Sequence, residues 1–359
     1  MAKKILVVDD SALMRRVICD IIDSDERFQV VGRATNGLEA YDLLSRNQYD
    51  AVVLDVNMPK MSGLQLLEEL RKNKISAKVM MASTDTKEGA KTTLDALELG
   101  ALDFIHKPDS AMDCRVESFK EKLLSTLDVV ANSRPAVFSS FGRVQDNRQT
   151  AERMADMAKK FAAKNRGSKI VAIASSTGGP KSLQAVIPRL PAGLDAPVLL
   201  VQHMPKGFTA SLAERLNVLS QLQVKEAQEG DELQNGTVYV SMGGMHMNVK
   251  NSGGRYTIHY SDEPAREGVK PCANYMYESL VDSGFDEVVC VVMTGMGADG
   301  TEGIRNLEAK KKVHVIAQNQ ESCVVYGMPK NVINAGLSDQ IVPLDQLAQE
   351  IALNVGVKA

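Results

Sequence analysis

The chain has 359 residues, of which 44% are hydrophobic and 24% charged, and its formal net charge at pH 7 is −3. This composition is typical of a globular protein, and the length favours two domains over one. The slight negative charge and the absence of Trp argue against a nucleic-acid-binding protein and against electrostatic binding to an anionic membrane.

The five cysteines are dispersed, and none lies in a CxxC pattern, which argues against a structural zinc site and fits reduced thiols. The first apolar run ends at Asp9 and Asp10, so it does not match a signal peptide. No apolar run has the length of a membrane span. We therefore expect a cytoplasmic protein with no membrane insertion.

The first half of the chain alternates between strand and helix patterns. The predicted strands are Lys4–Asp10, Phe28–Ala34, Asp50–Asp55, Lys78–Ser83 and Ala101–Pro108. The predicted helices follow Ser11 and cover Gly37–Arg46, Leu64–Lys72 and Thr86–Leu99. This alternation predicts a doubly wound parallel sheet with helices on both faces. Ligand sites in such folds lie beyond the carboxyl ends of the strands.

Three acids, Asp9, Asp10 and Asp55, lie at these strand ends. Carboxylates gathered at one point repel each other unless a cation joins them, and Mg2+ suits oxygen ligands. Lys107 supplies a second positive charge at another strand end, and Ser83 ends a further strand. Each acid alone would also fit a helix cap, but three acids and a lysine together favour a site.

These residues resemble the receiver domain of two-component response regulators, a flavodoxin-like fold, over roughly the first 120 residues. The resemblance implies that Asp55, in the motif LDVNMPKMSGL, accepts a phosphoryl group from a histidine kinase. The other implied roles are Mg2+ binding by Asp9, Asp10 and Asp55, contact with the phosphoryl oxygens by Ser83 and Lys107, and an aromatic switch at Phe104.

A change of pattern separates the two halves. Periodicity is lost near Val130, and Asn132–Thr150 is typical of a linker. The next segment, Ala151–Lys169, favours a packed connector helix over a docking peptide. We therefore predict a receiver domain over residues 1–125, a linker with a helix over 126–167 and a second domain over 168–359.

The second half opens with the sequence KIVAIASSTGGPKSL, Lys169–Leu183. Its short apolar run predicts a buried strand, and Gly178, Gly179 and Pro180 predict a tight turn into a helix. Free N–H groups at a helix N-terminus stabilise a developing oxyanion, so Ser176 is a candidate nucleophile. A phosphate-binding loop and a helix cap without chemistry are the alternatives.

The rest of this half continues the alternation around a β-rich part. The predicted strands are Ala196–Pro205, Asp286–Met293 and Val313–Gln318, and the β-rich part comprises Val224–Gln228, Thr237–Val249 and Tyr256–Tyr260. The predicted helices are Ser182–Leu190, Gly207–Asn217, Pro271–Gly284, Gly300–Ala309, Met328–Gly336 and Pro343–Asn354. This pattern predicts a doubly wound, mostly parallel α/β domain with an added β-hairpin region.

His203 and Asp299 each follow a predicted strand end, as Ser176 does. Because parallel strand ends share one crevice, we expect the three side chains to lie together. A histidine can take the serine proton near neutral pH, and a carboxylate fixes the imidazole tautomer. The chain order Ser, His, Asp and the absence of GxSxG argue only against the α/β-hydrolase family. Taken alone, Asp299 is more typical of a helix N-cap.

The glycines of TGMGADG, Thr294–Gly300, allow close approach of the backbone, so the Met296 N–H is a candidate oxyanion donor. A loop that binds nucleotide phosphates is the competing interpretation, although the turn lacks the P-loop lysine and GxGxxG. The roles of Ser175 and of His246, a weaker candidate after a Gly-Gly turn, stay open.

Five motifs, in the order SSTGGP, VQHMP, TVYVSMGGMHM, MTGMGADG and VVYGMPK, resemble the catalytic domain of the chemotaxis protein-glutamate methylesterase family. Together with the receiver half, this resemblance covers nearly the whole chain. It implies a catalytic triad of Ser176, His203 and Asp299, with the Met296 N–H in the oxyanion hole. Ser176 takes this role rather than Ser175 because it immediately precedes the TGG of the motif.

The resemblance implies a phosphorylation-activated esterase of chemotaxis adaptation, which hydrolyses glutamyl methyl esters on chemoreceptors and deamidates receptor glutamines. The partners implied are methylated chemoreceptors and a chemotaxis histidine kinase, with no nucleic acid. Mg2+ would serve only the receiver, and ester hydrolysis would need no cofactor. The receiver would cover the active-site crevice until Asp55 is phosphorylated. The competing hypothesis is a response regulator with a non-catalytic nucleotide-binding output domain.

Some positions depart from the family's pattern. KPCANYM, Lys270–Met276, stands where an RPSVDVLF-like sequence is expected, QNQES replaces the common QDEAT, and Asn57 replaces a common acidic residue. These departures bear on substrate contacts and on the rate of dephosphorylation, for which the family pattern gives no expectation here. We expect none of them to touch the triad.

Overall fold

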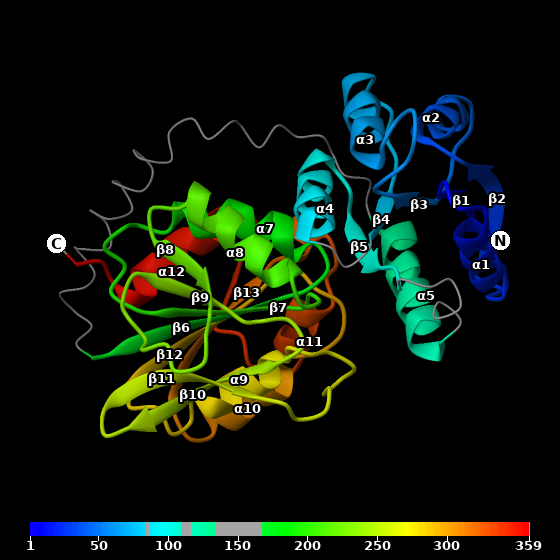
Figure 1. Cartoon of the computed structure of the whole chain (residues 1–359). Helices are drawn as coiled ribbons and strands as arrows, with labels where there is room; N and C mark the ends of the chain where they lie inside the picture. Colours follow the sequence, from blue (N-terminus) through cyan, green and yellow to red (C-terminus); the bar gives the residue numbers. More distant parts are fainter. Residues whose placement is uncertain (84–86, 109–115, 134–166, 359) are drawn as a thin grey trace. The chain divides into compact units, whose positions relative to one another are not determined.

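The computed structural model describes residues 1–83, 87–108, 116–133 and 167–358 (Figure 1). The chain divides into two compact units, Met1–Phe141 and Gly142–Ala359. Most of the predicted linker and connector helix lies outside the described residues, so the domain boundaries at 125 and 168 stay predictions. Within the described residues, no helix is both long and apolar enough to cross a membrane.

The first unit is a five-stranded parallel sheet in the order β2-β1-β3-β4-β5. Its strands are β1 (Lys3–Val8), β2 (Phe28–Ala34), β3 (Ala51–Asp55), β4 (Val79–Ser83) and β5 (Asp103–His106). Its helices are α1 (Ala12–Asp23), α2 (Gly37–Arg46), α3 (Gly63–Lys72), α4 (Lys87–Leu99) and α5 (Glu117–Asn132). This strand order confirms the predicted flavodoxin-like receiver fold.

Local sequence explains where the first helices start. The side chains of Ser11, Asn36 and Ser62 accept hydrogen bonds from N–H groups in the first turns of α1, α2 and α3. Strands β3 and β4 are buried along their whole length, which matches their continuous apolar runs. In each of these two strands the one polar side chain, Asp55 in β3 and Ser83 in β4, is the last residue, at the carboxyl edge of the sheet.

The second unit contains a seven-stranded parallel sheet in the order β14-β13-β12-β6-β7-β9-β8. Its strands are β6 (Lys169–Ser175), β7 (Val198–Gln202), β8 (Gln223–Glu226), β9 (Thr237–Val240), β12 (Glu287–Val292), β13 (Lys312–Gln318) and β14 (Gln340–Val342). Its helices are α7 (Gly179–Val186), α8 (Phe208–Leu219), α9 (Ala273–Ser279), α10 (Thr301–Glu308), α11 (Met328–Asn334) and α12 (Leu347–Val355).

The separate hairpin, β10 (His246–Ser252) and β11 (Arg255–Ser261), pairs in an antiparallel manner. The predicted strand segment Thr237–Val249 is thus divided, because β9 joins the main sheet whereas β10 starts the hairpin. Figure 1 shows α7, α8 and α12 on one face of the sheet, and α9, α10 and the hairpin on the other. This layering confirms the predicted doubly wound fold with an added hairpin.

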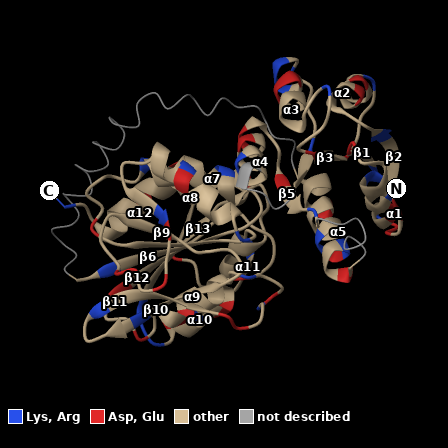
Figure 2. Ribbon diagram, in the orientation of Figure 1, with Lys and Arg blue, Asp and Glu red and all other residues tan. Residues whose placement is uncertain are grey.

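Strand β6 lies at the centre of the second sheet, between β12 and β7. The chain leaves β6 towards β7 on one side and later returns through β12 on the other side. The strand order therefore reverses at β6, and a crevice is expected outside its carboxyl end. In the view of Figure 2, acidic and basic residues are interspersed on both units.

Candidate active site

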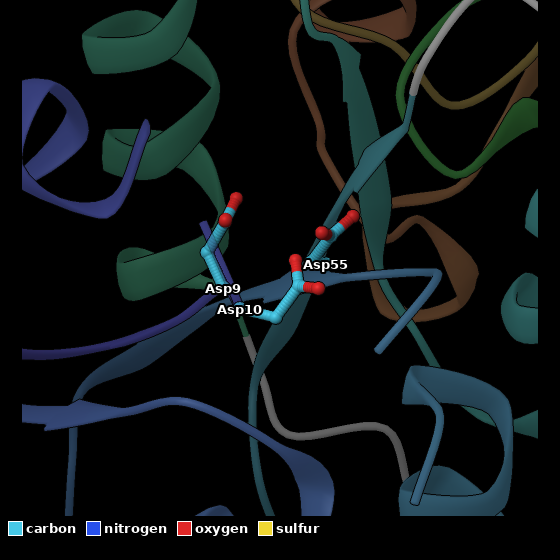
Figure 3. A group of neighbouring side chains, drawn as sticks. All are labelled: Asp9, Asp10 and Asp55. Atoms are coloured by element: carbon cyan, nitrogen blue, oxygen red, sulfur yellow. The ribbon is translucent and has the colours of Figure 1, made fainter. Parts of the chain in front are cut away.

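Three acids of the first unit gather at the carboxyl edge of its sheet (Figure 3). Asp9 and Asp10 follow β1 and Asp55 ends β3, and one carboxylate oxygen of each lies within 4.8 Å of the others. The Lys107 Nζ lies 3.0 Å from Asp9 Oδ2 and 2.7 Å from Asp55 Oδ1. Ser83 ends β4, and its carbonyl accepts the Lys107 N–H.

Charge balance at this cluster favours a bound cation. Burial, together with the nearby Asp9, raises the pKa of Asp55 despite the opposing effect of Lys107. Burial lowers the pKa of Lys107, but Asp55 and Asp9 raise it by more, so Lys107 is held in its charged form. One ammonium facing three carboxylates leaves excess negative charge, and a hard divalent cation with oxygen ligands fits that set. Phe104 is buried on β5, and its proposed switch role stays a prediction.

In the second unit, the residues Ser176–Gly179 turn the chain from β6 into α7. The Ser176 N–H donates to the Thr294 carbonyl beyond β12, and the Ser176 carbonyl accepts the Gly179 N–H. Gly178 has φ +76°, a left-handed conformation that favours glycine. The same turn places Pro180 in the first turn of α7.

Ser175 and Ser176 have different environments. The Ser175 hydroxyl is fully buried and donates to Gln202 Oε1 at 2.7 Å. The Gln202 amide in turn donates to the carbonyls of Ser176 and His203, at 2.9 and 3.2 Å. Ser176 itself is only partly buried. Ser175 is therefore a structural residue that links the serine turn to the end of β7, and Ser176 is the accessible hydroxyl.

His203 and Asp299 are in direct contact, with 2.7 Å between His203 Nε2 and Asp299 Oδ2. The carboxylate also accepts the N–H groups of Ala273 and Asn274, at 2.6 and 2.9 Å, and the Cys272 thiol at 3.0 Å. Burial raises the pKa of Asp299, but these hydrogen bonds, led by that from His203, outweigh it and hold the pKa below its usual value. Asp299 is therefore an anionic acceptor.

An anionic acceptor at Nε2 places the imidazole proton on that nitrogen and leaves the His203 Nδ1 lone pair free. Nδ1 is buried and has no hydrogen-bond partner among the described residues. The His203 N–H donates to the Ser175 carbonyl, so the histidine follows β7 beside the serine turn. Nδ1 is therefore the ring nitrogen left without a proton, and the backbone of His203 lies next to the serine turn.

The peptide between Gly295 and Met296 is fixed from one side. The Gly295 carbonyl accepts the N–H groups of Gly327 and Met328, at 3.0 and 2.9 Å. In a trans peptide the N–H points opposite to the carbonyl, so the Met296 N–H points away from α11. A Cβ atom on Gly295 would lie 2.8 Å from Ser176 Cβ, so this peptide lies beside the serine. These contacts fit an oxyanion donor at Met296.

The comparisons with known proteins identify the family of each half of the chain. The family model described as CheB methylesterase matches residues 171–351, and that of the response regulator receiver domain matches residues 5–115. The chain belongs to the CheB methylesterase family. It is therefore a carboxylic ester hydrolase joined to a receiver domain, as the sequence predicted, and the rival nucleotide-binding output domain finds no support.

Individual relatives span nearly the whole chain. A protein-glutamate methylesterase/protein-glutamine glutaminase 1 of Syntrophomonas wolfei is 41% identical over 97% of this chain and 98% of its own length. The Bacillus subtilis protein-glutamate methylesterase/protein-glutamine glutaminase is 40% identical over 97% of each chain. The crystal structure of the Thermotoga maritima CheB methylesterase catalytic domain is 40% identical, with a TM-score of 0.50, and covers 51% of this chain and 97% of its own.

One expectation about this family member was wrong. We expected its departures from the family pattern to leave the triad candidates untouched, but Cys272 of the segment KPCANYM donates its thiol to Asp299. The reason is tertiary packing, because α9 begins beside the turn that follows β12. Cys272, Ala273 and Asn274 at the start of this helix therefore surround the Asp299 carboxylate.

Sequence reasoning also missed three supporting residues of this methylesterase. Gln202 joins the serine turn to His203, Asn274 donates its backbone N–H to Asp299, and Asn331 donates to the carbonyls of Gly297 and Gly327. Gln202 directly precedes His203, and a polar residue in an otherwise apolar strand was the one available signal. The contacts of Asn274 with Asp299 and of Asn331 with Gly297 span 25 and 34 residues of sequence, and a single sequence does not reveal them.

Proposed function

We propose that this chain is a phosphorylation-activated protein-glutamate methylesterase that acts on methylated chemoreceptors in chemotaxis adaptation. The observation that supports the catalytic part is the 2.7 Å contact between His203 Nε2 and Asp299 Oδ2, which favours a proton on Nε2 and leaves Nδ1 as the candidate base for Ser176. The family membership supports the reaction class, and the names of the relatives support glutamyl methyl ester and glutamine as the groups attacked.

In the acylation step, Ser176 Oγ attacks the ester carbonyl carbon while His203 Nδ1 takes the hydroxyl proton. The carbonyl oxygen becomes an oxyanion, which the Met296 N–H stabilises. Asp299 stays ionised and stabilises the imidazolium. His203 then gives its proton to the departing methoxide, so methanol leaves and a glutamyl ester with Ser176 remains.

Deacylation repeats these roles with water as the nucleophile. His203 takes a proton from the water that attacks the glutamyl-serine ester, and returns it to Ser176 Oγ as that bond breaks. The product is a free glutamate side chain. Deamidation of a receptor glutamine follows the same path with ammonia as the first leaving group, so one site serves both reactions.

In the receiver, a chemotaxis histidine kinase would phosphorylate Asp55, and Asp9, Asp10 and Asp55 would hold Mg2+. The bound ion would neutralise charge on the transferred phosphoryl group. Lys107 and Ser83 would contact the phosphoryl oxygens. Phe104 would respond to this change, and the response would relieve inhibition of the esterase by the receiver. Ester hydrolysis itself would use no metal ion.

Methanol release tests the catalytic assignment. Receptor membranes carrying radioactively labelled methyl esters are incubated with the full chain, and volatile methanol is counted. We expect the wild-type chain to release methanol and Ser176→Ala to release none above the rate without enzyme. Normal release by Ser176→Ala would contradict the nucleophile, and no release by the wild-type chain would contradict the substrate.

A further inference from the structure

The segment Cys272–Asn274 surrounds the Asp299 carboxylate at the start of α9. Cys272 is the N-cap residue of that helix, but its side chain makes no capping hydrogen bond. Instead the thiol and the next two backbone N–H groups all donate to Asp299. The position of this segment therefore sets the direction of the carboxylate, and through it the orientation of the His203 ring.

His246, the first residue of β10, holds this segment through a second contact. Its side chain is fully buried, and its Nδ1 accepts the Cys272 N–H at 3.2 Å. Its Nε2 lies 3.2 Å from the Pro264 carbonyl, so Nε2 carries the proton and the ring is neutral. The ring also contacts Tyr275 of α9, with ring centroids 4.5 Å apart. His246 thus contacts both the backbone of Cys272, just before α9, and the side chain of Tyr275 within it.

We infer that His246 is a positioning residue of the esterase, which holds the start of α9 around Asp299 and so keeps His203 in its catalytic tautomer and orientation. This inference rests on the proposed function, because it concerns the same triad. His246 touches neither the serine nor the reacting atoms. Its effect passes through the Cys272 N–H to the three donors on Asp299, and from Asp299 to His203.

The two ring nitrogens of His246 have different partners, Cys272 at Nδ1 and Pro264 at Nε2. Only Nδ1 faces the Cys272 N–H, so an acceptor at the Nδ1 position is what the triad requires. An asparagine places its Oδ1 near that position, whereas a glutamine places its Oε1 near the position of Nε2. His246→Asn and His246→Gln are therefore a matched pair of similar size and polarity that differ in where the acceptor lies.

We expect His246→Asn to keep kcat for receptor demethylation within about threefold of wild type. We expect His246→Gln and His246→Ala to lower kcat about 10- to 100-fold with little change in KM, because a small displacement of the triad slows chemistry without weakening substrate binding. The far-downfield proton resonance of the His203–Asp299 hydrogen bond should persist in His246→Asn and be lost in His246→Gln.

The melting temperatures of all three variants control for a merely structural role. A loss of kcat that follows the melting temperature rather than the acceptor position would contradict the inference, as would equal kcat values in His246→Asn and His246→Gln. Covalent labelling by a fluorophosphonate reads the reactivity of Ser176 without a receptor. If the wild-type chain is labelled but releases no methanol, the proposed substrate fails, and the labelling rates of the variants still decide the role of His246.

Discussion

Ser175 and Ser176 differ by one position in the chain, but only one of them is free to act. The Ser175 hydroxyl is committed to Gln202. We therefore expect a fluorophosphonate to modify Ser176 alone, as located by mass spectrometry of the digested protein. Ser176→Ala should abolish labelling. Modification of Ser175 in the wild-type chain would reverse the assignment.

Ser175→Ala is the matched control for that experiment. It removes the donor to Gln202 Oε1 in a fully buried setting. We expect labelling of Ser176 to continue in this variant. The free energy of unfolding should fall by about 1–3 kcal/mol, because the Gln202 oxygen is left without its partner.

The buried carboxylate of Asp299 predicts a dependence of stability on acid. Its pKa in the folded state is lowered, so the folded state binds its proton less readily than the unfolded state. The resulting stabilisation is fully present above the unfolded value, at about pH 4, and is lost as the pH falls through the lower folded value.

Urea unfolding of the wild-type chain and of Asp299→Asn across this range tests the sign. Asn cannot titrate, so the stability difference between the two proteins should be largest at neutral pH and should shrink in acid. A difference that grows as the pH falls would show that the folded pKa is raised instead of lowered.

At the scale of whole elements, α11 supports the peptide that carries the proposed oxyanion donor. Asn331 donates to the carbonyls of Gly297 and Gly327, at 2.9 and 3.1 Å, and so ties the glycine-rich turn to the helix. We expect Asn331→Ala to lower kcat for methanol release about 10-fold with KM unchanged, because an oxyanion contact acts mainly in the transition state.

Asn334→Ala is the control for this prediction, since Asn334 is an exposed residue of the same helix. Its kcat should equal that of the wild-type chain. A change in KM with constant kcat in Asn331→Ala would place this residue in substrate binding and contradict its role behind the oxyanion donor.

The elements also show how far sequence reasoning reaches. Strands β6, β7 and β12 are buried apolar runs that end at polar or glycine-rich turns, so the positions of Ser176, His203 and Asp299 after strand ends were predictable. The adjacency of those three strands was not, because strand order depends on contacts between distant segments.

The same limit explains the residues that were missed. The contacts of Asp299 with Cys272 and Asn274, and of Cys272 with His246, each join positions about 25 residues apart through tertiary packing. The local pattern around Cys272 predicted only the start of a helix. The polar groups that contact Cys272 come from the hairpin and from the turn after β12, so they depend on how those two segments pack against α9.

For the whole molecule, the two units carry separate chemistry. The first gathers Asp9, Asp10, Asp55 and Lys107, which fit phosphoryl transfer, and the second gathers the proposed hydrolytic residues. Joining a receiver to an esterase gives one chain a phosphorylation-dependent input and a catalytic output. The proposed function requires that a charge change at Asp55 alter the rate at Ser176.

Methanol release with and without a small phosphodonor tests this requirement most directly. The full chain is assayed on methylated receptor membranes in the presence of Mg2+, before and after addition of acetyl phosphate, and Asp55→Asn is assayed in parallel. We predict that acetyl phosphate raises the wild-type rate, and that Asp55→Asn keeps the basal rate but shows no rise. Equal stimulation of the wild-type chain and of Asp55→Asn would contradict the account.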